Sequence, residues 1–65
     1  MKLSDQIEQA LADHAAAYPN GDFRSVNDRL GELFMASWGV LVKAGKDPTK
    51  GGNEGRIKAL REIGH

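Results

Sequence analysis

Hydrophobic positions recur with a helical period along most of the chain, and they are densest in the middle, between Ser25 and Gly45. At 100° per residue, the large apolar side chains of this stretch cover roughly 220° of the helix circumference. A helix with so little polar surface needs neighbours on two sides. The pattern therefore predicts a central helix over residues 24–44 with packing partners. Its apolar arc comprises Val26, Leu30, Leu33, Phe34, Met35, Trp38, Val40, Leu41 and Val42.

The N-terminal third predicts a second amphipathic helix, over residues 4–18. Ile7, Leu11 and Tyr18 lie on one apolar stripe, and acidic and amide side chains occupy the opposite side. Ser4 is a candidate N-cap, because its hydroxyl can accept a hydrogen bond from a free backbone N–H of the first turn. Pro19 disfavours further helix and begins a turn. The two helices should therefore form a hairpin.

A loop rich in glycine and lysine follows Gly45, over residues 45–53, and its composition predicts flexibility. Asn53 is a candidate N-cap for a short third helix over residues 54–63, and Gly64 is a natural stop. Gly55 weakens that helix, so it needs to dock against the others.

Gly31 and Gly39 lie inside the predicted central helix. Each costs roughly 1 kcal/mol relative to alanine there. The two positions therefore indicate either a close neighbour or a weak point in the helix.

These elements predict an all-α fold of one domain, a helical hairpin with a short C-terminal helix. Sixty-five residues are near the lower limit for an unaided apolar core, and the two flanking helices cover only part of the central arc. We therefore expect self-association into a helical bundle, with a compact three-helix monomer as the alternative. The expected interface consists of Leu30, Phe34, Met35, Trp38, Leu41 and Val42.

Composition narrows the classes of function. The chain has no cysteine, which excludes disulfides, thiol catalysis and cysteine-ligated metals. We find neither a signal-peptide pattern nor an apolar run approaching the roughly 20 residues of a membrane span, and we expect a soluble cytoplasmic protein.

The net charge is zero, but its distribution is uneven. Residues 1–22 hold one basic and four acidic side chains, whereas residues 43–65 hold six basic and three acidic ones. The basic third is a candidate surface for nucleic acid or a small anion, or it pairs with the acidic third. Its cationic residues are Lys43, Lys46, Lys50, Arg56, Lys58 and Arg61.

Other candidates for chemistry are few. His14 lies on the apolar stripe of the first helix, where a packed histidine is commoner than a metal ligand or a pH switch. Asp28 and Glu32, one turn apart, are typical of a solvated face and less often hold a divalent cation. We find no cofactor motif and no nucleophile with a placed base, so no cofactor and no enzymatic activity are expected.

The sequence thus predicts a non-catalytic, self-associating helical protein that acts by binding a macromolecule, as a regulator, inhibitor or assembly factor. A protein partner is expected in addition to a second copy. Two alternatives remain: an accessory protein that binds nucleic acid through the basic third, and a binder of a small anionic ligand or nucleotide at a subunit interface.

Overall fold

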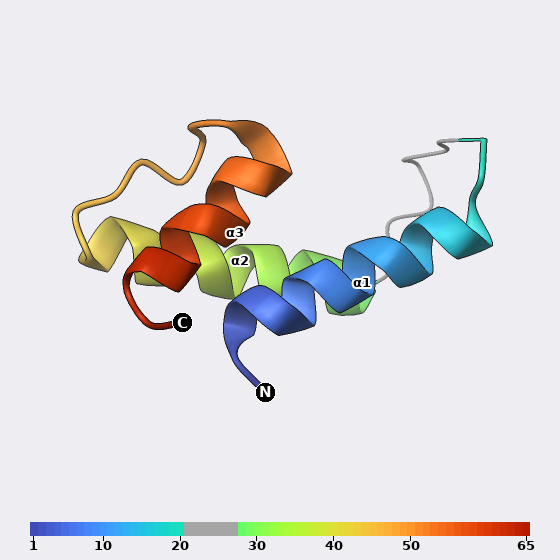
Figure 1. The fold of residues 1–65 in the computed structure, drawn as a ribbon, viewed down its shortest axis with the longest axis horizontal. Helices are drawn as coiled ribbons and strands as arrows, with labels where there is room; N and C mark the ends of the chain where they lie inside the picture. Colours follow the sequence, from blue (N-terminus) through green and yellow to red (C-terminus); the bar gives the residue numbers. More distant parts are fainter. Residues whose placement is uncertain (21–27) are drawn as a thin grey trace.

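The computed structural model describes residues 1–20 and 28–65, and it is all-helical over these ranges. Helix α1 spans Leu3–Ala17, α2 spans Asp28–Lys43 and α3 spans Gly52–Glu62. Each helix contacts the other two. In Figure 1, α1 and α3 lie in front of α2, and the two chain termini lie near each other. The predicted all-α hairpin with a third helix is confirmed.

The N-terminus of α1 differs from the prediction. Ser4 is not the N-cap: the helix already begins at Leu3, Lys2 precedes it, and no side chain caps it. The buried backbone N–H of Ser4 instead donates to the carbonyl oxygen of His65 at 2.8 Å. The end of the chain thus satisfies one of the free N–H groups with which every helix begins.

The other end of α1 agrees with the prediction to within one residue. Tyr18 has left the helical conformation, with φ −129° and ψ 70°, as expected before Pro19. The continuation of the turn that Pro19 begins, from residue 21, and the predicted start of the central helix at residue 24 lie outside the described residues.

Helices α2 and α3 both end at a glycine in the left-handed conformation. Gly45 has a φ of 76°, its N–H donates to the carbonyl of Val42 at 3.0 Å, and the N–H of Lys46 donates to that of Leu41 at 2.8 Å. This pair of bonds is the Schellman motif, which satisfies carbonyls that the helix leaves free. Gly64, with a φ of 83°, ends α3 in the same way.

The start of α3 corrects a second predicted cap. Gly51, with a φ of 78°, occupies the N-cap position instead of Asn53, and the helix begins at Gly52. A Cβ atom at Gly55 would overlap the carbonyl oxygen of Lys50 and lie 3.0 Å from its carbonyl carbon. Glycine at position 55 is therefore needed for the loop to close onto the helix.

The loop before α3 has local order. Asp47 Oδ1 accepts hydrogen bonds from the Thr49 hydroxyl at 2.6 Å and from the Thr49 backbone N–H at 2.8 Å. These bonds, led by the one from the hydroxyl, hold the pKa of Asp47 below its usual value. Pro48 between them is buried. The predicted flexibility of the whole loop stays a prediction.

The core draws on all three helices. Ile7 of α1, Leu41 of α2 and Leu60 of α3 are completely buried. Around them the same cluster includes Ala10, Leu30, Leu33 and Ile57. Because α1 and α3 both pack against α2 and contribute to this cluster, the core lies along one side of the central helix.

Candidate functional site

The side of α2 that faces away from the core is apolar and exposed. Leu30 and Leu41 are 2% and 0% exposed, whereas Met35 is 79%, Trp38 48% and Val42 54% exposed. Met35, Trp38 and Val42 follow one another at spacings of three and four residues, which places them on one side of the helix. We call this surface, Met35, Trp38 and Val42, the apolar face of α2.

A hollow of about 270 Å³ lies beside this face, lined by Phe34, Met35, Trp38 and Arg56. Arg56 reaches it from α3: its guanidinium carbon lies 4.6 Å from the centre of the Phe34 ring. The same guanidinium donates to the carbonyl oxygen of Pro48 at 3.4 Å. A cation held over an aromatic ring shields one side of Phe34 and leaves the Met35 and Trp38 side open.

The structure divides the interface that the sequence predicts. Leu30 and Leu41 belong to the core of their own chain and offer no surface to a second copy. Phe34 is half-buried, and Met35, Trp38 and Val42 are exposed. The predicted set contained both kinds because a single broad arc includes the part that α1 and α3 cover and the part that they leave open.

The glycines inside α2 face open space. A Cβ atom at Gly31 or at Gly39 would meet nothing within 4 Å. The close neighbour that these positions suggest is therefore not supplied by the described part of this chain. Both glycines lie beside Met35, one turn before and one turn after it.

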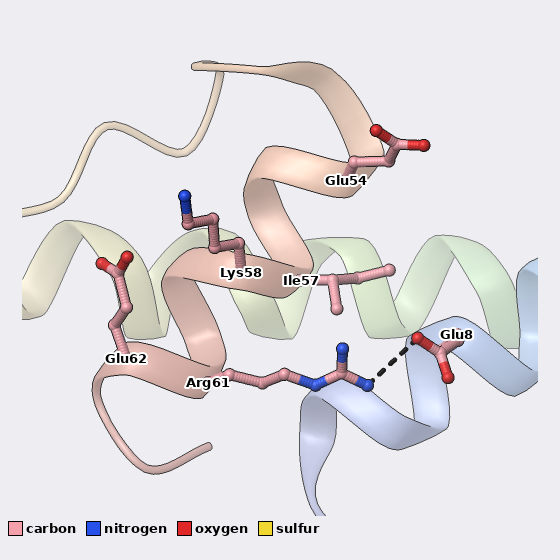
Figure 2. A pocket seen from close by; sticks show the side chains of 6 residues that line it. All are labelled: Glu8, Glu54, Ile57, Lys58, Arg61 and Glu62. Carbon is pink, nitrogen blue, oxygen red and sulfur yellow. Dashed lines mark hydrogen bonds and ion pairs between the residues drawn. The ribbon is translucent and has the colours of Figure 1, made fainter.

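Charged side chains join α1 to α3. Arg61 of α3 lies 3.0 Å from Glu8 Oε2 and 3.4 Å from Asp5 Oδ1, both on α1. The bonds to Glu8 and Asp5 raise the pKa of Arg61. Figure 2 shows Arg61 reaching across to Glu8 along a pocket of about 470 Å³. The acidic and basic thirds of the sequence thus meet within one chain.

The six cationic residues of the basic third do not form one patch. Arg61 pairs with α1, Arg56 covers Phe34, and Lys46 pairs with Glu62 at 3.1 Å. Lys43, Lys50 and Lys58 make no ion pair within residues 1–20 and 28–65.

Three of the lysines do share one pocket, of about 420 Å³, between the loop and α3. Lys46, Lys50 and Lys58 line it together with Asp47 and Glu62. Arg56, which the sequence groups with Lys46 and Lys50 as a contact for an anion, does not line this pocket. The two carboxylates offset most of the positive charge there.

His14 is packed in the fold. It is 7% exposed, and its ring lies 4.9 Å from that of Tyr18, tilted by 42°. Among the residues that the structure describes, no group of three or more His, Cys, Asp or Glu side chains is placed to hold a metal ion. The side chain of Asp28, one member of the predicted carboxylate pair, lies outside the described part.

Over the described ranges, no helix has the length and apolar character that a membrane crossing requires. No protein family model, curated protein or solved structure matches the chain.

Sequence reasoning missed one feature of this site, the role of Arg56 beside the apolar face. The sequence pattern groups Arg56 with the other cationic residues of the basic third, because it shows charge but not position in the fold. Its place over Phe34 depends on how α3 docks against α2, and no local pattern carries that information.

Proposed function

We propose that this chain is a non-catalytic protein that self-associates through the apolar face of α2 and acts by binding a macromolecule, as a regulator, inhibitor or assembly factor. One observation carries the proposal: three large apolar side chains, Met35, Trp38 and Val42, are about half exposed or more on one side of one helix. Clustered apolar exposure of this kind is typical of an interaction surface.

The free energy expected from covering the apolar face of α2 supports reversible association. Complete burial of one such side chain contributes about 1.5–3 kcal/mol, so covering the exposed parts of all three contributes about 3–5 kcal/mol per copy. Two copies double that gain to about 6–10 kcal/mol, which exceeds the lower end of the cost of association, about 4–15 kcal/mol, by a few kcal/mol. We expect a dissociation constant of about 0.1–1 mM.

The chemistry of the face fits binding and not catalysis. Met35, Trp38 and Val42 offer no group that takes up or releases a proton near neutral pH, and no nucleophile. Pairing through α2 leaves the outer surfaces of α1 and α3 of each copy open to a partner. A paired molecule therefore presents those surfaces twice, which strengthens binding to a repeated or symmetric target.

Solution mass tests this proposal. Light scattering over a dilution series from about 1 mM downward should show a mass above the 7.1 kDa of one chain at the high end. Met35→Glu should shift the series toward the single chain, because it places a charge in the face without touching the core. Ala12→Glu, at an exposed position of α1, is the matched control. A mass of one chain at every concentration would refute the proposal.

A second candidate, binding of a small anion, is favoured by the lysines that share the 420 Å³ pocket, Lys46, Lys50 and Lys58. A thermal-shift titration with inorganic phosphate tests it, since a ligand of the folded state raises the melting temperature. Lys50→Ala should reduce the shift, whereas Lys43→Ala, outside the pocket, should not. Equal shifts in both variants would exclude this pocket.

A further inference from the structure

Two oppositely charged side chains border the apolar face of α2 on the same side. Glu32 and Lys43 are about 20° apart in helical projection, next to Met35, whereas Phe34 lies on the opposite border. Both are exposed, and neither makes an ion pair with a residue that the structure describes. They are therefore available to a neighbour that covers the face.

Their positions along the helix are arranged around Trp38. Trp38 follows Glu32 by six residues and precedes Lys43 by five. At 1.5 Å per residue, the two charges lie about 16 Å apart along the helix axis, with the tryptophan near the midpoint. The negative charge lies toward one end of the apolar face and the positive charge toward the other.

This arrangement is complementary to itself under a two-fold rotation. When two identical helices pack antiparallel, the same border of each adjoins the same border of the other, and a residue before the axis faces one equally far after it. A two-fold axis through Trp38 therefore brings Glu32 of each helix opposite Lys43 of the other. Both ion pairs form together.

We propose that the apolar face of α2 is covered by α2 of a second copy running antiparallel, with Trp38 of both copies at the two-fold axis and Glu32 of each paired with Lys43 of the other. This inference rests on the self-association proposed above and specifies its geometry. A parallel pair would instead bring the Glu32 and Lys43 border of one helix against the Phe34 border of the other. On that border no acidic side chain of α2 is available to pair with Lys43, and the nearby Arg56 is held by the Phe34 ring and the Pro48 carbonyl oxygen.

The backbone of α2 suits this close approach. Gly31, Met35, Trp38 and Val42 follow the four, three, four spacing of a coiled-coil seam. Gly31 and Gly39 have open space where a Cβ would be, so the side chains of a second helix can approach the backbone there. The two glycines, which only weaken an isolated helix, thereby gain a packing role.

The test uses charge reversal in the full chain. Glu32→Lys places like charges opposite each other in both pairs of a self-paired variant, and Lys43→Glu does the same with the opposite sign. Each variant alone should have a dissociation constant about tenfold above that of the parent chain at low salt. An equimolar mixture of the two variants should associate to within about threefold of the parent, because both mixed pairs again join opposite charges.

Matched controls separate this effect from a change in net charge. Glu54→Lys and Lys58→Glu alter the charge equally at exposed positions of α3. Each should associate as the parent chain does, and mixing them should change nothing. Circular dichroism of every variant should show the helix content of the parent. The loss and the rescue should both diminish at 1 M salt, where charges are screened within about 3 Å.

The results of this experiment distinguish the antiparallel geometry from self-association itself. Weakened single variants whose mixture recovers support the antiparallel pair. A parent chain that associates while the mixture is no tighter than either variant overturns the antiparallel geometry and leaves the self-association standing. A parent chain that stays single at every concentration overturns both.

Discussion

Two glycine-to-alanine substitutions provide the sharpest check on the fold, because the same chemical change should have opposite effects at two helical positions. At Gly39 the added methyl group meets nothing within 4 Å. Alanine there should stabilise the single chain by about 1 kcal/mol, the difference in helix propensity. At Gly55 the methyl group would overlap the carbonyl oxygen of Lys50, a backbone atom that no rotamer change can move.

The magnitude at position 55 follows from that overlap. Forcing extra atoms into a packed position costs about 1–3 kcal/mol, and here either the loop or α3 must also shift. After the propensity gain is offset, we expect Gly55→Ala to lose about 2 kcal/mol. For a domain of this size, 1 kcal/mol corresponds to about 4–8 °C in the melting temperature. Gly39→Ala should therefore melt about 5 °C above the parent chain and Gly55→Ala about 10 °C below it.

Thermal and urea unfolding followed by circular dichroism measures both variants. The protein should be kept at about 10 μM, below the expected dissociation constant, so that pairing through α2 does not contribute. A Gly55→Ala variant as stable as Gly39→Ala would refute the close approach of Lys50 to α3. A destabilised Gly39→Ala at this dilution would show that the exposed side of α2 is occupied in the single chain.

Three further predictions follow from the same contacts. Leu41→Ala, at a completely buried position in the core to which all three helices contribute, should lower the free energy of unfolding by about 2–5 kcal/mol in urea titrations; a smaller loss would contradict its place in the core. The pKa of the Asp47 carboxyl, measured by NMR, should lie below that of a free aspartate. Its hydrogen bonds therefore stabilise the fold above about pH 4, and this stabilisation is lost as the pH falls through the lowered pKa. Thr49→Val should raise that pKa, and an unchanged value would exclude the hydroxyl bond. Arg61→Ala should cause a small loss of stability that vanishes at 1 M salt, because both of its ion pairs are exposed; a loss independent of salt would point to packing instead of charge.

The three helices could be predicted because their signals are local. A helical period and the glycines at positions 45 and 64 act over a few residues, and the structure agrees with them to within one or two residues at the described ends of the helices. Both predicted N-caps failed for a different reason. Ser4 is buried and its backbone N–H donates to the carbonyl oxygen of His65. Asn53 is not the N-cap because Gly51, with its left-handed backbone, already occupies that position. Such contacts depend on distant or preceding segments that propensity does not include.

The amino-acid sequence alone determined that apolar side chains cover most of the circumference of the central helix, because hydrophobic periodicity gives the direction of each side chain from the helix axis. Only the tertiary structure decided which part of that surface is enclosed. Leu41 and Trp38 are about 60° apart in projection, yet Leu41 is completely buried and Trp38 is about half exposed. The difference arises because α1 and α3 dock on one side of α2, and docking direction is a property of three helices together.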